Sequence, residues 1–399
     1  MSSESQIPID SKGASRRFAV RLSLFYGATF GMIGAHLPFF TVWLKAVGID
    51  AWWIGVIAAV PSLTRFTVLP VVTSLAERFS LRGALIVTAL ATALGFAVIG
   101  TQHLPFAVLL VYVVTCSFWT PLIPLTDAYA LRGVARFGLN YGPLRLWGSA
   151  AFVVGALACG MLVDVVAATH LIWVIAGVAA LGAIASLGLQ PLDRPKAAAA
   201  AVKGASALLR DPGFLAIIFT SALIQGSHAA YYTFASISWQ AAGLNGLTIA
   251  GLWVLGVLAE IVVFALSPRF TLSPALLVVI AALSAVARWL ITAQEPSVAL
   301  LAMVQLAHGL TYGLTQVGTM SLLVRHVPIH MMARGQGYLA ACGGIVTSVA
   351  SILSGMVYAG YGQRVYYLMA AMALVAAGVM WLARGRLRAL AREAGTGSR

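Results

Sequence analysis

Charged residues are rare in this chain. Asp, Glu, Lys and Arg together make up 9% of its 399 residues, whereas 61% are apolar and the mean hydropathy is +0.94. A water-soluble domain carries roughly 25% charged residues, so the composition excludes a soluble globular protein. The chain also lacks the alternating pattern of membrane β-barrel strands, and its apolar runs are long and continuous. We therefore predict an all-α polytopic membrane protein.

Cysteine and catalytic motifs are scarce as well. The three cysteines lie singly in apolar segments, with no CxxC and no paired spacing: Cys116, Cys159 and Cys342. This spacing excludes a disulfide framework and a cysteine metal site. The constellations that intramembrane enzymes use, which are paired aspartates, HExxH or GxSG, do not occur. We predict no enzymatic activity, no cofactor and no bound metal.

The chain does contain twelve apolar segments, each long enough for a helix that crosses a bilayer, which takes about 20 residues. They are 19–44, 53–76, 82–101, 104–130, 142–164, 169–190, 212–241, 247–268, 272–292, 297–325, 334–360 and 364–384. The sequence therefore predicts twelve transmembrane helices.

One polar, basic and alanine-rich stretch divides these segments into two equal sets. We predict a six-helix bundle over 1–190, a cytoplasmic linker over 191–211, and a second six-helix bundle with a basic cytoplasmic tail over 212–399. Three glycines of the fifth segment recur in the eleventh at an offset of 195: Gly142, Gly148 and Gly160 match Gly337, Gly343 and Gly355. Two parallel six-helix repeats are the layout of major facilitator transporters, whose substrate site lies between the halves.

Lys and Arg indicate the orientation in the membrane. If both termini are cytoplasmic, twenty of them lie in inner segments and only Lys45 and Arg364 lie in outer loops. This bias follows the positive-inside rule and predicts a multi-pass protein of the inner (cytoplasmic) membrane with both termini in the cytoplasm. The net charge of +14 then reflects orientation and contact with anionic lipids, so we expect no nucleic-acid partner. We expect the chain to work as a monomer.

Two charged residues flank the loop between the fourth and fifth segments. Asp127 lies nine residues before Arg136, the middle of that loop, and Arg145 lies nine residues after it. At about 1.5 Å per residue they reach the same depth on neighbouring antiparallel helices, which predicts an ion pair. A charge inside the bilayer is costly, so the pair either ties the two helices together or binds substrate and the coupled proton.

The second half repeats this arrangement. Glu260 and Arg288 flank the turn near Ser273, 13 residues before it and 15 after it, which makes them a second candidate ion pair. The neighbours of Glu260 are almost wholly apolar and disfavour its charged form, so we predict that it carries the coupled proton. The alternative is that this pair only ties two helices together.

Arg65 lacks an acidic partner in its own hairpin. Three arginines lie inside predicted helices, Arg65, Arg145 and Arg288, against the two carboxylates Asp127 and Glu260. The surplus positive charge would suit an anionic substrate, because a guanidinium binds a carboxylate in a bidentate fork. The alternative is that Arg65 snorkels toward the cytoplasmic surface.

Histidines and aromatic residues complete the candidate site. His36, His228 and His308 lie in the first, seventh and tenth segments, and each is either a hydrogen bonder between helices or part of a path for substrate or proton. We predict His36 and His228 in substrate binding and His308 in proton coupling. The aromatic residues near them either form a wall around a ring-shaped substrate or pack in the core: Tyr231, Tyr232 and Trp253, with Trp239 and Tyr312.

Four stretches carry a resemblance to a known family. They are "PLTDAYAL" with "YGPLRLWGS", "QGSHAAYYTFASISWQAAG", "GLWVLGVLAEIVVF" and "QLAHGLTYG". In these stretches the chain resembles the major facilitator superfamily, and within it the phenylpropionate permease branch, which is related to the lactose permease and nucleoside–proton symporter groups. The resemblance covers nearly the whole chain and implies the twelve-helix fold and a transport function.

The resemblance also implies roles for the charged residues. Asp127 and Arg145 fall where lactose permease has its sugar-binding pair, and Glu260, Arg288 and His308 fall in its proton-coupling region. One further coupling carboxylate of that group is missing here, because "HGLTYGLTQVGTMSLLV" contains no acid. Glu260 would therefore act without it.

A gating motif of the superfamily is partly present between the second and third segments. In "SLAERFSLRG", Glu77, Arg78 and Arg82 match its acidic and basic positions, while Ser74 replaces the leading glycine. The resemblance implies a gating loop at these residues.

From these features we predict a proton-coupled symporter that imports a small organic solute by alternating access, and we favour an aromatic or other organic acid. The alternatives are a nucleoside or sugar proton symporter and a proton-driven exporter, although the "RxxQGxG"-like signature usual in exporters is absent from the fourth segment. A receptor that does not transport is a further alternative, which a flux assay would separate.

Overall fold

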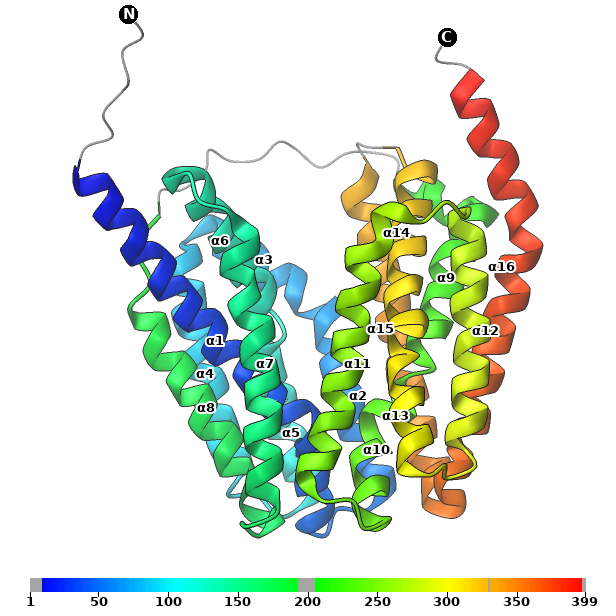
Figure 1. Ribbon diagram of the computed structural model, residues 1–399. Helices are drawn as coiled ribbons and strands as arrows, with labels where there is room; N and C mark the ends of the chain where they lie inside the picture. The colour runs from blue at the N-terminus through cyan, green and yellow to red at the C-terminus, as the bar shows by residue number, and fades with distance from the viewer. Residues whose placement is uncertain (1–8, 193–204, 329–330, 397–399) are drawn as a thin grey trace, which may run out of the picture. The chain divides into compact units, whose positions relative to one another are not determined.

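The computed structural model of the protein describes residues 9–192, 205–328 and 331–396, and the regular structure in these ranges is helical throughout (Figure 1). The all-α fold class predicted from the sequence is therefore confirmed. The α-helices are α1 (Ile9–Ala46), α2 (Ala51–Thr67), α3 (Leu69–Arg78), α4 (Leu81–Ile99), α5 (Pro105–Trp119), α6 (Leu122–Phe137), α7 (Tyr141–Val163), α8 (Leu171–Leu187), α9 (Pro212–Gly226), α10 (Ala229–Ala241), α11 (Gly246–Leu266), α12 (Pro274–Thr292), α13 (Val298–Leu306), α14 (Thr315–His326), α15 (Met332–Tyr361) and α16 (Val365–Thr396). Short helical turns lie between some of them: η1 (Ala168–His170), η2 (Ala205–Arg210), η3 (Ser267–Arg269), η4 (Gly309–Leu314) and η6 (Gly362–Arg364).

The described helices account for twelve membrane spans. Ten segments are long and apolar enough to cross a membrane, and the pair α2 and α3, bent by 45°, makes one more. One of the ten, Arg334–Leu387, has 54 residues, which as a single helix would reach about 80 Å, against about 30 Å of hydrocarbon. It contains α15 and α16, separated by η6 at Gly362, whose φ of 56° ends the helix. Counted as two, these bring the total to twelve.

Four of the predicted spans are continuous in sequence but interrupted in the structure. The breaks lie between α2 and α3, between α5 and α6, between α9 and α10, and at the π-helical turn η4 between α13 and α14. The second break is at Pro121, which has no backbone N–H to continue the helix. Each break frees backbone N–H and C=O groups from helical hydrogen bonds. Such groups are tolerated at membrane depth where surrounding protein, including side chains, can bond to them.

Contacts group the chain into two units. The first comprises Met1–Val47, Thr67–Ala198 and Asn245–Leu247, and the second comprises the rest: Gly48–Phe66, Ala199–Leu244 and Thr248–Arg399. Thus α2 groups with the helices of the C-terminal half, and the first turn of α11 groups with those of the N-terminal half. The predicted division at 190 and 212 stays a prediction. Most of the predicted linker, residues 193–204, lies outside the described residues, and 205–210 form η2.

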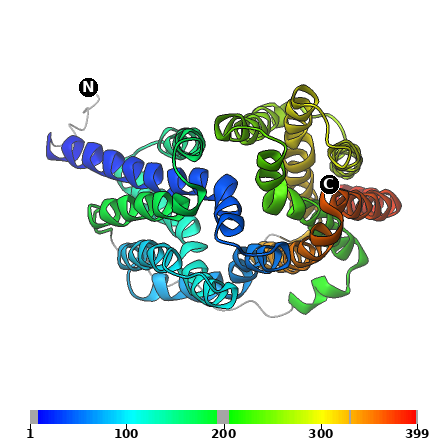
Figure 2. The ribbon, with the colours of Figure 1, turned by 90° about the horizontal axis from the view of Figure 1, so that it is seen from below.

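Close backbone contacts join α1 to α7 in the first unit (Figures 1 and 2). A Cβ atom added at Gly34 would lie 2.2 Å from the carbonyl oxygen of Phe152, and one added at Gly155 would lie 2.2 Å from that of Gly31. Glycine is therefore required on both helices. Small residues at such crossings increase the packing contact that holds membrane helices together.

Two of the glycines that the internal repeat relates make similar close contacts. A Cβ at Gly355 in α15 would lie 2.7 Å from the carbonyl oxygen of Ala51 in α2. A Cβ at Gly246 in α11 would lie 2.2 Å from the carbonyl oxygen of Gly160 in α7. Beside Gly160, the carboxylate of Asp164 accepts the backbone N–H of Gly246 at 2.7 Å and so caps the first turn of α11.

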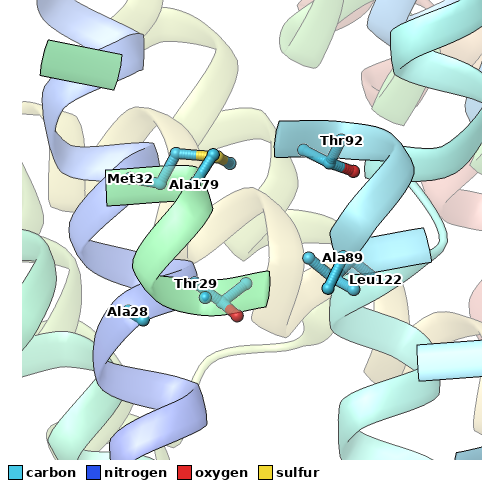
Figure 3. A pocket seen from close by; sticks show the side chains of 8 residues that line it. Ala28, Thr29, Met32, Ala89, Thr92, Leu122 and Ala179 are labelled. Carbon is cyan, nitrogen blue, oxygen red and sulfur yellow. The ribbon is translucent and has the colours of Figure 1, made fainter. Parts of the chain in front are cut away.

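A small cavity in the first unit lies between α1, α4, α6 and α8 (Figure 3). Its lining consists of small or apolar side chains and two threonines: Ala28, Thr29, Met32, Ala89, Thr92, Leu122, Ala179 and Gly182. The hydroxyl of Thr92 donates to the carbonyl of Thr88 at 2.7 Å. The lining includes none of the residues predicted to bind substrate, so we interpret the cavity as a packing gap among four helices.

The α1–α7 contact yields a prediction about stability. Gly155→Ala places a methyl carbon 2.2 Å from the carbonyl oxygen of Gly31. Overpacking of this kind lowers stability by about 1–3 kcal/mol. We expect a lower apparent Tm for the purified variant in detergent. The control is Gly177→Ala in α8, where nothing lies within 4 Å of the added Cβ, so its Tm should match or exceed the wild-type value. Equal Tm values for the two variants would contradict the packing argument.

A carboxylate–histidine pair fixes the start of α9. Asp211 accepts the backbone N–H of Gly213 at 2.9 Å through one oxygen and Nε2–H of His326, at the end of α14, through the other. Partial burial acts to raise the pKa of Asp211, but the Gly213 N–H and His326 outweigh it and hold that pKa below its ordinary value of 3.8. The folded state therefore favours the ionised carboxyl.

This pair yields a prediction about pH. Because the folded-state pKa of Asp211 is lowered, its contribution to stability is present above the unfolded value and is lost as the pH falls through the folded value. Asp211→Asn keeps an N-cap but removes the charge. We expect it to lower the apparent Tm at pH 7, and the difference from wild type to shrink as the pH falls toward and below 3.8. Asp50→Asn, which changes the residue that caps α2 through the Trp53 N–H, is the control. A difference that does not depend on pH would assign the effect of Asp211 to packing.

Candidate functional site

The first group of polar residues, here called the Asp127 cluster, lies in the first unit and comprises Tyr26, Phe30, Asp127, Tyr141 and Arg145. One oxygen of Asp127, Oδ1, accepts the hydroxyl of Tyr26 at 2.6 Å and that of Tyr141 at 2.9 Å. Nε of Arg145 lies 3.7 Å from the same oxygen. The structure thus brings the predicted Asp127–Arg145 pair together and adds two tyrosines.

Arg145 is held from two directions. Its guanidinium lies over the ring of Phe30, 4.0 Å from the centroid, and Asp127 approaches its Nε side. The two terminal nitrogens make no hydrogen bond or ion pair with the residues that the structure describes, and the side chain is 30% exposed. The outer edge of the guanidinium therefore remains available to a ligand.

The second group, here called the Arg288 cluster, lies in the second unit and is centred on an arginine that is 2% exposed. Nη1 of Arg288 donates to Nδ1 of His308 at 2.9 Å and to Oγ1 of Thr311 at 3.0 Å, and Nη2 donates to Oε1 of Gln305 at 3.1 Å. The guanidinium also lies 4.7 Å from the ring centroid of Tyr231. All of these contacts are with neutral groups.

The predicted direct pair of Glu260 with Arg288 is wrong. Oε2 of Glu260 lies 3.9 Å from Nε2 of His308, so the imidazole stands between the carboxylate and the guanidinium. Tertiary packing separates the two residues, because α12 packs against α14, η4 and α16. Residues of the tenth membrane span (α13, η4 and α14, here called span ten) therefore lie between the carboxylate of Glu260 and the guanidinium of Arg288. Matching depth along two spans does not make the helices neighbours.

The close approach of Glu260 to His308 depends on Gly309. A Cβ at this position would lie 2.5 Å from the carbonyl oxygen of Ala259, so only glycine permits span ten to come so close to α11. Gly309 also begins the π-helical turn η4, which carries Thr311 and Tyr312. π-Helical turns are rare in proteins, and those that occur often lie at functional sites.

The predicted aromatic residues of the second unit do gather beside the Arg288 cluster. The rings of Tyr231 and Trp253 are 4.6 Å apart, and Trp253 also lies near Tyr232 at 6.0 Å. The indole N–H of Trp253 donates to Oγ of Ser236 at 2.9 Å. Tyr312 stacks on His308 with 5.3 Å between centroids. These rings form one connected group, although Tyr231 and Trp253 are almost completely buried.

The three histidines differ in their surroundings. His228 is fully buried, and its ring nitrogens contact the carbonyl oxygen of Ile224 and the hydroxyl of Thr311. His36 is 7% exposed and packs among aromatic rings of the first unit, with Nε2 3.1 Å from the hydroxyl of Tyr112. Direct substrate binding by His36 and His228 stays a prediction, and only His228 and His308 lie in the Arg288 cluster.

Arg65 lies in α2, in the same unit as the Arg288 cluster, and its side chain is exposed. Its predicted role in binding an anionic substrate stays a prediction.

In the predicted gating loop, between α3 and α4, Arg82 binds the end of another helix. Its Nη2 and Nε donate to the carbonyls of Leu187, at 3.2 Å, and Leu189, at 2.5 Å, where α8 ends. Such carbonyls have no partner within the helix, so the guanidinium satisfies them. Arg78 is exposed at the end of α3, and the side chain of Glu77 lies outside the described part of the structure. The gating role stays a prediction.

Sequence reasoning missed Tyr26, Tyr141, Gln305 and Thr311. Hydroxyl and amide side chains are common in membrane helices, and nothing local marks these four. Among the described residues, no group of three or more His, Cys, Asp or Glu is placed to hold a metal ion.

Comparisons with known proteins agree with this architecture. The model of the MFS_1 like family matches residues 19–369. The probable 3-phenylpropionic acid transporter of Escherichia coli strain K12 is 32% identical over 366 residues, covering 89% of this chain and 95% of that protein. The maltose permease of Geobacillus stearothermophilus is 28% identical over 340 residues, covering 83% and 85%. A crystal structure of nucleoside transporter NupG superimposes with a TM-score of 0.81 at 17% identity, covering 92% of this chain and 98% of that chain.

The structural likeness shows the fold, and the matched family model with the 32% identical relative shows the family. This chain belongs to the MFS_1 like family and is a multi-pass membrane transporter of the major facilitator superfamily, not an enzyme.

Proposed function

We propose that this transporter is a proton-coupled symporter that imports a small organic acid by alternating access, with an aromatic acid as the favoured substrate. The observation that carries the proposal is the line from Glu260 through His308 to Arg288, in which one imidazole joins a carboxylate to a buried guanidinium. The excess of Lys and Arg in the predicted inner segments supports a place in the inner membrane with both termini in the cytoplasm. We take the monomer as the working form.

Protonation of Glu260 changes the charge balance of the Arg288 cluster. When Glu260 is ionised, it offsets the positive charge of Arg288 through His308. When Glu260 takes up a proton, the guanidinium stays charged and 2% exposed, and its countercharge is gone. An uncompensated buried charge is costly, so an anion that binds nearby is stabilised. Proton and anion binding then favour each other, as symport requires.

One arginine in each unit is a candidate ligand for the carboxylate of the substrate. In the first unit, Arg145 is 30% exposed and lies flat on Phe30, so its free edge suits a bidentate carboxylate. In the second unit, the side chain of Arg65 in α2 is exposed. The ring of Phe30 offers an apolar face for an aromatic substrate. The relative in Escherichia coli is named for 3-phenylpropionic acid, an aromatic acid.

The first test concerns the proton. Glu260→Gln keeps the size of the side chain but cannot release a proton. In proteoliposomes, we expect the variant to retain exchange of labelled 3-phenylpropionate across the membrane and to lose accumulation driven by a pH gradient. The control is Glu295→Gln, which changes a residue in the turn between α12 and α13 and should keep both activities. Gradient-driven accumulation by Glu260→Gln at the wild-type level would contradict the assignment.

The second test concerns the carboxylate. Arg145→Gln removes a charge-assisted contact, so we expect a loss of about 10- to 100-fold in affinity for 3-phenylpropionate. The amide of the same acid should bind wild type and variant about equally. Arg364→Gln, in the turn η6, is the control and should leave both affinities unchanged. Equal losses for the acid and the amide would show that Arg145 supports the structure only.

Competition by other solutes separates the substrate classes. We expect 3-phenylpropionate and other aromatic acids to inhibit uptake, and we expect uridine and maltose, which represent the nucleoside and sugar alternatives, to have little effect. Strong competition by uridine or maltose would favour a nucleoside or sugar symporter instead. Outward movement of the solute against a proton gradient would indicate an exporter.

A further inference from the structure

The hydrogen bonds of the Arg288 cluster have a direction, which begins at the break between α9 and α10. The carbonyl oxygen of Ile224 lies 2.9 Å from Nδ1 of His228. The carbonyl is available to this ring because it lies in the last turn of α9. A carbonyl oxygen can only accept a hydrogen bond, so Nδ1 of His228 carries a proton.

The next bond fixes the hydroxyl of Thr311. His228 is fully buried, and the cation Arg288 is bonded to the same threonine. A second uncompensated positive charge there would be costly, so the ring is neutral and its Nε2 accepts. The hydroxyl of Thr311 has two acceptors in reach, this nitrogen at 3.0 Å and the backbone carbonyl of His308 at 3.4 Å, and its one proton goes to the nitrogen, which is closer and needs a donor. The lone pairs of Oγ1 remain for Nη1 of Arg288, which lies 3.0 Å away and can only donate.

The same logic continues through Arg288 to His308. Nη1 donates its other proton to Nδ1 of His308 at 2.9 Å, while Gln305 accepts from Nη2 at 3.1 Å. Because Nδ1 of His308 accepts, the neutral ring carries its proton on Nε2, and Nε2 is the atom that faces Glu260 at 3.9 Å. His228 and His308 are thus expected to hold opposite tautomers in one connected network.

From this order of donors and acceptors we infer that Thr311 and His228 are positioning residues for His308: they hold Arg288 where it keeps the His308 proton on Nε2, facing Glu260. The Nε2–H of His308 then faces the ionised Glu260 at 3.9 Å, and this nitrogen has no free lone pair to take the proton from it. The coupled proton consequently stays on Glu260 and does not pass to the imidazole. This consequence for transport rests on the proposed function, whereas the tautomers do not.

Other charged or titratable groups lie near the network. They come from every neighbouring element and are Arg65 in α2, Tyr231 and Tyr232 in α10, Glu260 in α11, Arg288 in α12, Tyr312 in η4 and Tyr366 in α16. A change in a pH profile alone therefore does not report on His308, and the test needs a direct measurement of the tautomer.

The variant Thr311→Val removes the hydroxyl and keeps the shape of the side chain. It leaves Nη1 of Arg288 with one acceptor in place of two, so the guanidinium is held less firmly against His308. The matched control is Thr315→Val, because Thr315 is equally buried and donates only to the backbone carbonyl of Thr311. Thr311→Ser restores the hydroxyl. His228→Phe keeps an aromatic ring and removes both of its hydrogen bonds, which gives a second route to the same effect.

The measurement is nitrogen NMR of ¹⁵N-histidine-labelled protein in lipid, with the two residues assigned by the variants His308→Gln and His228→Phe. In wild type we expect the proton on Nε2 of His308 and on Nδ1 of His228. In Thr311→Val, the ratio of the two His308 tautomers should shift about tenfold toward Nδ1–H, the size of effect that one hydrogen bond to a charged group supports. His228, held by Ile224, should keep its tautomer. Thr311→Ser and Thr315→Val should resemble wild type.

Uptake of labelled 3-phenylpropionate is measured on the same variants. We expect Thr311→Val to shift the pH profile of gradient-driven uptake while exchange continues, and Thr311→Ser to restore it. A proton on Nδ1 of wild-type His308, or a His308 tautomer that Thr311→Val and His228→Phe leave unchanged, would overturn the inference. If the tautomers are as expected but no variant, wild type included, couples uptake to protons, then the proposed function fails and the positioning role stands.

Discussion

A buried guanidinium that contacts no carboxylate of the described residues is the constraint on which the Arg288 cluster depends. Within the described ranges, Arg288 donates to the neutral acceptors His308, Thr311 and Gln305, and the carboxylate of Glu260 lies beyond an imidazole. A cation held in this way is costly to bury, so it needs polar partners: Nη1 and Nη2 have them, whereas Nε is buried with no hydrogen-bond partner among the described residues. The helix interruptions meet this need, because the end of α9 frees the carbonyl that orients His228, and η4 carries Thr311.

The same network requires helices to approach more closely than ordinary side chains permit. Gly309 allows span ten to touch the backbone of α11 beside Glu260. Glycines also allow α7 to pack on α1, and α15 to pack on α2, at distances that exclude any Cβ. Because lipid offers no hydrophobic driving force between helices, such contacts have to come from close packing and polar bonds. The glycines thus allow close helix packing, and this packing positions the residues of the charged clusters.

The sequence predicts the spans, their number and one of the two charged pairs. Asp127 and Arg145 were found because a short loop joins their helices, so equal spacing from the loop means adjacency. The same spacing argument failed for Glu260 and Arg288, because α12 packs against span ten and α16. Nor does sequence order reveal that α2 groups with the C-terminal helices. Tyr26, Tyr141 and Thr311 left no signal, because the partner of a hydroxyl is decided by tertiary packing.

The two carboxylates differ in the described groups that surround them. Oδ1 of Asp127 accepts two phenol hydroxyls at 2.6 and 2.9 Å and lies 3.7 Å from Arg145. Asp127 is thus held by two hydroxyl groups and one guanidinium. Among the described residues, Glu260 has one long polar contact, of 3.9 Å with His308, and apolar neighbours along α11. A proton on Glu260 therefore disturbs few bonds, yet it removes the countercharge of Arg288. In the proposed symport, this loss of countercharge is what lets a proton on Glu260 favour the binding of an anion near Arg288.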